Sequence, residues 1–160
     1  SYNIIPVDEL PANAKYLTKK GDILVSTVRP NRGAVTIINE DDVLVSGAFT
    51  VLRTNSEYPK ETLQALLRTE LYKDWLLKYN VGTSYPVIKD ENVLNMPIPI
   101  FSGKTNNDIK IKMQEATLNI DKANKMLDIA KSSVEIAIEQ SEENAIDYIN
   151  QQLTELGVEI

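Results

Sequence analysis

The chain has 160 residues, a formal net charge of −6 and neither cysteine nor histidine. Its length suits one compact domain or a smaller domain with an appendage, and its apolar runs are too short to cross a membrane. Without histidine or cysteine, Ser-His-Asp and Cys-His enzymes and thiolate metal sites are excluded within this chain. The cysteine-free composition fits the cytoplasm.

The acidic charge is concentrated at the C-terminal end. Residues 1–104 hold 12 basic and 12 acidic side chains, whereas residues 105–160 hold 5 basic and 11 acidic ones. The first part is therefore neutral overall and is able to present a local basic face, as nucleic-acid-binding surfaces do.

Short β-rich runs predict strands through residues 1–57. The runs are DILVSTV, AVTII, DVLVS and AFTVLR, and they are divided by Gly, Asn and Asp. Such spacing indicates an antiparallel or mixed sheet. Because the alternation in DILVSTV is imperfect, we expect this strand to be buried on both faces.

A polar turn separates the first two runs and carries two arginines. Arg29 and Arg32 flank Pro30 and Asn31, and Gly33 follows. Proline stiffens such a turn, and glycine permits a backbone that other residues avoid. Guanidinium groups held there suit bidentate contact with a phosphate or a guanine edge, and an asparagine suits adenine. A solvated hairpin turn is the alternative interpretation.

Residues 59–80 change to helical periodicity. Leucines recur at helical spacing, which predicts one amphipathic helix that ends near Gly82. The loop GTSYP follows, with hydroxyls and backbone amides of the kind that hold phosphates, although an ordinary connection is the alternative. A short apolar strand, a turn and the extended Pro-x-Pro segment MPIPI come next.

The last third of the chain predicts one long helix from Thr105, which opens a variant capping box, to a C-terminal cap at Gly157. A strict heptad seam with alanine at alternate positions runs along it. We expect this seam to pair with another helix, and a hairpin broken near Ser132–Ser133 is the competing interpretation. The seam consists of Ile109, Met113, Ala116, Ile120, Ala123, Leu127, Ala130, Val134 and Ala137.

These elements define an α+β fold class: a mixed β-rich domain followed by one long coiled-coil-forming α-helix. The predicted domain spans residues 1–104, and the helical dimerisation or spacer arm spans residues 105–157. Since the chain opens on Ser1, we expect the domain to lack an upstream portion.

The order of the pieces resembles the specificity subunits of type I restriction-modification systems. The pieces are KKGDILVSTVRPNRGAV, VSGAFTVLR, a leucine-rich helix, GTSYPVIKDENVLNMPIPI and a long helix. The chain is similar to the later part of one target recognition domain and the helix that follows it. It differs in having FSGKTNND where the family usually has a Glu-Gln pair, and its recognition part is not basic overall.

The resemblance implies a function in DNA recognition. In the family, each target recognition domain reads one half of a split DNA sequence, and long helices set the spacing and dock adenine-N6 methyltransferase subunits. The expected partners are double-stranded DNA, the methyltransferase, a restriction/translocase subunit and a second copy paired through the helix. Carried onto this chain, the candidate DNA contacts are Arg29, Asn31, Arg32, Thr83, Ser84, Tyr85 and Lys89.

No cofactor is expected in this chain, because the resemblance places S-adenosylmethionine in the methyltransferase subunit. The sequence also lacks a methyltransferase N/D-P-P-Y/F motif and a nucleotide-binding loop. We therefore expect a non-enzymatic DNA reader. The alternatives are a coiled-coil protein-interaction module without DNA binding and an enzyme that uses carboxylates alone, for which no motif is present.

Overall fold

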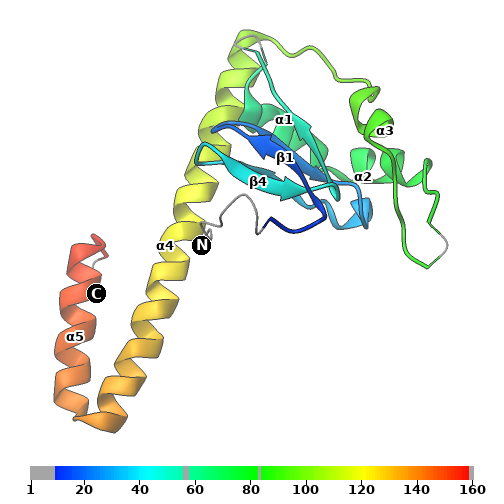
Figure 1. The fold of residues 1–160 in the computed structure, drawn as a ribbon. Coiled ribbons are helices and arrows are strands. Elements are labelled where there is room, and N and C mark those ends of the chain that lie inside the picture. Colours follow the sequence, from blue (N-terminus) through cyan, green and yellow to red (C-terminus); the bar gives the residue numbers. More distant parts are fainter. Residues whose placement is uncertain (1–9, 56–57, 83, 159–160) are drawn as a thin grey trace. The chain divides into compact units, whose positions relative to one another are not determined.

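The computed structural model describes residues 10–55, 58–82 and 84–158 (Figure 1). The chain divides into two compact units between Met113 and Gln114, and each is described by itself below. Among the described residues, no helix combines the length and the apolar character needed to span a bilayer.

The first unit is built on two small antiparallel sheets. One pairs β1 with β4, and the other has the order β3-β2-β5, so that β2 is the central strand. The four predicted strands are confirmed, whereas β1 was not singled out by the sequence patterns. The strands are β1 (Ala14–Thr18), β2 (Ile23–Ser26), β3 (Val35–Ile37), β4 (Val43–Ser46) and β5 (Phe49–Leu52).

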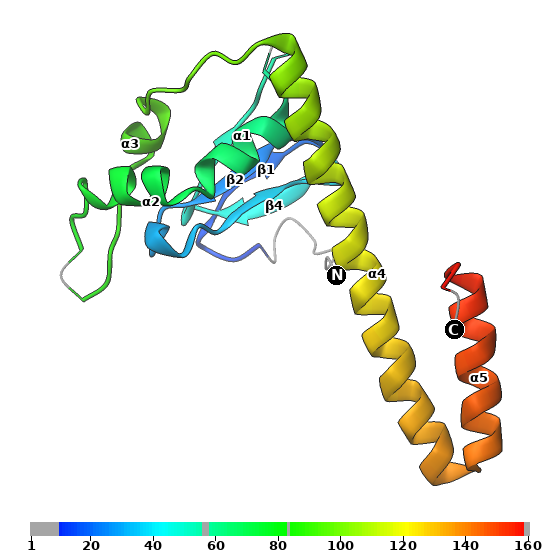
Figure 2. The ribbon, with the colours of Figure 1, turned by 180° about the vertical axis from the view of Figure 1, so that it is seen from behind.

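Strand β2 is buried on both faces, as its imperfect alternation predicted. Ile23, Leu24 and Val25 are all nearly inaccessible to solvent. Ile23 and Val25 belong to the main core, where they pack with Leu63 and Leu67. Helix α1 (Lys60–Leu67), which carries Leu63 and Leu67, covers one face of the strands. It lies behind the strands in Figure 1 and in front of them in Figure 2.

The prediction of a single helix over residues 59–80 is wrong, because the structure has two helices in this range. They are α1 (Lys60–Leu67) and α2 (Glu70–Leu77). Thr69 separates them with extended backbone, and its hydroxyl donates to the Leu66 carbonyl at 2.7 Å. A threonine followed by Glu70 is a typical start of a new helix, since the acidic side chain complements the helix N-terminus.

The segment after the loop contains a short helix where the sequence predicted a turn. Helix α3 (Asp90–Leu94) is fixed by its first residue, because Asp90 accepts hydrogen bonds from the Tyr16 and Thr50 hydroxyls at 3.0 and 2.8 Å. The Pro-x-Pro segment then follows an irregular path, and the Tyr72 hydroxyl donates to the Pro97 carbonyl at 2.6 Å.

The long helix is present, but it ends earlier than predicted. Helix α4 (Gly103–Glu139) begins after Ser102, whose hydroxyl accepts from the Thr105 amide at 3.1 Å, so Ser102 is its capping residue. The fold class of a β-rich domain followed by a long helix is confirmed. The prediction of one continuous helix over residues 105–157 is wrong.

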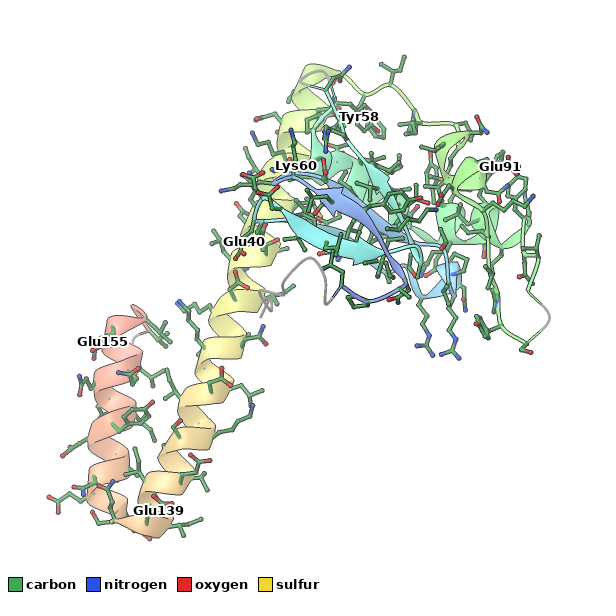
Figure 3. All side chains as sticks on the ribbon, viewed as in Figure 1. Glu40, Tyr58, Lys60, Glu91, Glu139 and Glu155 are labelled. Atoms are coloured by element: carbon green, nitrogen blue, oxygen red, sulfur yellow. The ribbon has the colours of Figure 1, made fainter. Side chains whose placement is uncertain are left out.

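A second helix, α5 (Glu142–Glu155), follows a tight turn after Glu139, which Figure 3 labels at the end of α4. Ser141 has extended backbone and caps α5 by accepting from the Asn144 amide at 3.2 Å. The chain therefore breaks eight residues later than the competing hairpin interpretation placed it. Gly157 ends α5 with φ of 62°, as predicted.

The second unit is a helical hairpin. Helix α5 runs back beside the C-terminal part of α4 in both views (Figures 1 and 2). Lys125, Ile129 and Ser132 of α4 line one groove with Tyr148 and Gln152 of α5. At 3.6 residues per turn, this face of α4 lies opposite the predicted heptad seam.

Candidate nucleic-acid interface

The arginine turn is a single 3₁₀ turn held between two left-handed residues. The turn spans Pro30–Arg32, with Arg29 (φ 54°, ψ 54°) before it and Gly33 (φ 62°) after it. The Arg32 amide donates to the Arg29 carbonyl, and the Gly33 amide donates to the Pro30 carbonyl, both at 3.0 Å. Pro30 is buried, while Arg29, Asn31 and Arg32 are exposed. The buried proline anchors the turn and leaves its polar side chains in solvent.

Asn80, which the sequence patterns did not identify, holds the two ends of the loop that contains Gly82 and Tyr85. Its side-chain carbonyl accepts from the Gly82 amide at 2.9 Å and from the Val87 amide at 3.0 Å. A Cβ on Gly82 would lie 1.9 Å from the Tyr85 carbonyl oxygen, so only glycine fits there. An asparagine close before a glycine is typical of side-chain-stabilised turns, and this was the available signal.

Backbone pairing joins the turn to this loop. Val28 and Val87 form an antiparallel bridge, the Arg29 amide donates to the Pro86 carbonyl at 2.7 Å, and the Ile88 amide donates to the Thr27 carbonyl at 2.9 Å. Two segments more than 50 residues apart in the sequence therefore form one continuous surface.

Side chains meet across this junction. The Arg29 guanidinium carbon lies 5.5 Å from the centre of the Tyr85 ring, within the range of a cation–π contact. Tyr85 is 47% exposed, so one part of the ring is free to meet a ligand. The pairing places Arg29 of the turn against Tyr85 of the loop. We call the exposed polar residues of the two joined segments the turn–loop surface: Arg29, Asn31, Arg32, Ser84 and Tyr85.

One predicted contact, Lys89, stands apart from this surface. Lys89 follows the paired stretch and precedes α3, and its ammonium lies 3.5 Å from the Glu91 carboxylate. Thr83 lies outside the described residues.

The charge of the turn is not neutralised within the part of the chain that is described. No carboxylate there lies within ion-pair distance of Arg29 or Arg32, whereas Arg53 and Lys73 have acidic partners. Exposed guanidinium groups without an acidic neighbour are available to phosphate oxygens or to base edges. The turn–loop surface therefore has the chemistry of an anion-binding or nucleic-acid-binding face, although the net charge of the chain is negative.

The predicted helix-pairing seam is a second candidate surface. Ile109 and Met113 are partly buried in the first unit. From Ala116 to Val134 every seam position is exposed, and Ala137 is half-buried. The large residues of this stretch, Ile120, Leu127 and Val134, are each more than half exposed. A row of exposed apolar residues at heptad spacing is typical of a helix that pairs with another helix.

Comparisons with known proteins place the chain in a family. The family model described as "Type I restriction modification DNA specificity domain" matches residues 1–127. The chain belongs to this family, and the resemblance noted from the sequence is confirmed.

One curated relative is the type I restriction enzyme MjaVIII specificity subunit of Methanocaldococcus jannaschii. It is 28% identical over 104 residues, which cover 61% of this chain and 24% of the relative. The chain thus matches about a quarter of that relative's length.

Two solved structures share the fold. The HsdS subunit from Thermoanaerobacter tengcongensis matches with a TM-score of 0.58 and 24% identity, covering 81% of this chain and 36% of the other. A chain from a study of complex assembly and conformational transition of the type I R-M system matches with a TM-score of 0.59 and 23% identity, covering 82% and 34%. At this identity the likeness shows the fold alone.

Proposed function

We propose that this chain reads part of a DNA target for a type I-like restriction-modification system. The observation that carries the proposal is the turn–loop surface, where two arginines without acidic partners in the described chain stand on a rigid turn joined to a second loop. Membership of the DNA specificity domain family supports the same function. In this proposal the chain catalyses nothing itself and works in the cytoplasm.

The chemistry of the surface suits double-stranded DNA. Arginine presents a planar fork of donors that matches both phosphate oxygens and the guanine edge, and asparagine offers the paired donor and acceptor that adenine requires. Ser84 adds a hydroxyl that is able to bind phosphate. The domain would act as one half-site reader, and an adenine-N6 methyltransferase subunit with bound S-adenosylmethionine would modify the DNA. A restriction/translocase subunit is the further proposed partner.

We also propose that the seam pairs with the same seam of a second copy. Alanine at alternate positions permits a close approach of two helices, and α5 leaves this face of α4 open. Such a dimer would hold two recognition domains at a fixed spacing, as dimeric DNA readers commonly do. The alternative is that the seam pairs with a helix of another subunit, and light scattering on the purified chain separates the two arrangements.

The first test replaces Arg32 by alanine and measures DNA affinity of the assembled complex as a function of salt. Loss of one phosphate contact should weaken binding and reduce the slope of log affinity against log salt by about 1. Lys20→Ala is the matched control, because Lys20 is an exposed cation in the turn that precedes β2, at the other end of this strand from the arginine turn. Equal affinity and slope for the Arg32 variant and the parent would contradict a DNA contact here.

The same titration separates DNA reading from a pure interaction module. A DNA reader loses affinity steeply as salt rises, whereas a protein-interaction module shows no DNA binding at any salt concentration.

The seam is tested by light scattering on the purified chain. We expect about twice the 17.9 kDa mass of one chain for the parent and a single-chain mass for a Leu127→Lys/Val134→Lys variant, because two charges would enter a dry seam. Leu118→Lys is the control, since Leu118 is similarly exposed but lies off the seam. A parent chain that stays monomeric at high concentration would contradict self-pairing.

A further inference from the structure

We propose that Arg29 determines sequence specificity by reading a guanine in the major groove, with Tyr85 as its positioning residue, while Arg32 contacts phosphate. This inference rests on the proposed DNA-reading function and assigns different tasks to the two arginines. It follows from the backbone at Arg29, the contact of its side chain and the different surroundings of Arg32.

The backbone of Arg29 is in a conformation that an arginine rarely adopts. Its φ of 54° is left-handed, which residues with a Cβ generally avoid. Arg29 also precedes Pro30, and a residue before proline normally takes extended backbone. Glycine would adopt this conformation without strain. An arginine that keeps this unfavourable backbone at an exposed position, where glycine would be free of strain, points to a functional demand on its side chain.

The surroundings hold Arg29 in this conformation. Its amide donates to Pro86, its carbonyl accepts from the Arg32 amide, and the following Pro30 is buried. These three restraints fix the direction in which the side chain leaves the turn. The backbone conformation of Arg29 is therefore determined by the turn and the loop together.

The side chain of Arg29 is restrained as well. Its guanidinium stands over the Tyr85 ring at 5.5 Å, and Tyr85 belongs to the loop that Asn80 and Gly82 shape. A guanidinium stacked on an aromatic ring loses part of its rotamer freedom before any ligand arrives. Readout of a base edge needs such a fixed fork, because two parallel hydrogen bonds to guanine O6 and N7 tolerate little misalignment.

Arg32 is placed differently. It is the last residue of the 3₁₀ turn, its side chain is exposed, and within the described chain it has no aromatic, acidic or hydrogen-bonding side-chain partner. An exposed cation without a fixed side-chain partner suits a phosphate, which accepts hydrogen bonds from many directions and carries no sequence information. The two arginines of one turn are thus expected to affect binding in separable ways.

The experiment selects duplexes from a randomised pool with the assembled complex and compares the enriched motifs of four variants. Arg29→Gly removes the side chain and relieves the backbone, so we expect a folded variant whose motif loses the preference for guanine at one position only. Arg32→Ala should enrich the parent motif with lower overall affinity. Tyr85→Ala should weaken the same guanine preference, and Tyr85→Phe should restore it, because the ring is kept.

A second arm identifies the contacted atom. A duplex with 7-deazaguanine at the affected position lacks the N7 acceptor, and the parent complex should bind it roughly tenfold more weakly, as expected for loss of half of a bidentate contact. The Arg29→Gly complex should bind both duplexes equally. The assignment would be overturned if the Arg29→Gly complex enriched an unchanged motif. It would also be overturned if 7-deazaguanine weakened the binding of the parent and Arg29→Gly complexes by the same factor. Failure of the parent complex to enrich any motif would instead contradict the proposed DNA-reading function itself.

Discussion

Replacing Leu67 by alanine is expected to lower the free energy of unfolding by about 3 kcal/mol, within the range measured for buried leucines. Leu67 ends α1, is 1% exposed and packs in the core with Ile23 and Val25 of the central strand. The loss combines the removed apolar area with the cavity that remains, because the surrounding core side chains relax only partly into the space.

Leu71→Ala is the matched control for this change. Leu71 stands four residues later, on the expected apolar face of a continuous helix, yet it is 73% exposed because the helix breaks at Thr69. Denaturant titrations should therefore show a large decrease in the free energy of unfolding for Leu67→Ala. For Leu71→Ala the free energy of unfolding should change by no more than about 0.5 kcal/mol. Similar losses at the two positions would contradict the break between α1 and α2.

Replacing Asp22 by alanine is expected to lower the free energy of unfolding by about 2 kcal/mol, since it removes a buried charged acceptor of three hydrogen bonds. Asp22 precedes β2 and is 1% exposed. It accepts from Arg53 Nε and Nη2 at 2.6 and 2.7 Å and from the Lys19 amide at 2.8 Å. Asp41→Ala is the control, because Asp41 accepts one hydrogen bond, from the Lys20 amide, at an exposed position.

The stability conferred by Asp22 depends on pH. The Arg53 hydrogen bond, opposed by burial and assisted by the Lys19 amide, lowers the pKa of Asp22 below its usual value of 3.8. A lowered folded-state pKa stabilises the protein fully above the unfolded-state value, and the contribution is lost as the pH falls through the folded-state value. The difference in the free energy of unfolding between the parent and Asp22→Ala should therefore be constant near neutrality and shrink below about pH 4. A difference that grows on acidification would contradict this assignment.

Strands and the class of fold were predictable because their signals are local. Runs such as DILVSTV carry strand propensity and turn boundaries within a few residues. The breaks of the helices were harder to predict, since they go with local hydrogen bonds of Thr69 and Ser141 rather than with a change in apolar period. Thr69 and Ser141 each end one helix and begin another, and neither break contains glycine or proline.

The heptad seam shows why periodicity does not locate such a break. Ser141 and Asn144 continue the seam at the correct spacing, yet the serine side chain caps the asparagine amide. The stretch IEQSEEN lies within the single helix that the sequence predicted, yet it contains the turn between α4 and α5. Local hydrogen bonding competed with helix continuation there and prevailed.

The site was predictable only as separate parts. The arginine turn and the GTSYP loop each carried a weak signal, but their contact depends on the Val28–Val87 bridge across 59 positions. No local pattern encodes that pairing. The organising role of Asn80 and the steric need for Gly82 likewise emerge only when the loop is closed.

The central claim is that this chain specifies a DNA sequence, and the most direct measurement is the genome-wide adenine methylation pattern of the source cell. The gene is kept intact, deleted, or restored with the parent or with an Arg29→Gly/Arg32→Ala variant. We predict that one split methyladenine motif disappears on deletion, returns with the parent and does not return with the variant. An unchanged pattern after deletion, with the gene expressed in the parent cell and the methyltransferase active, would contradict the claim.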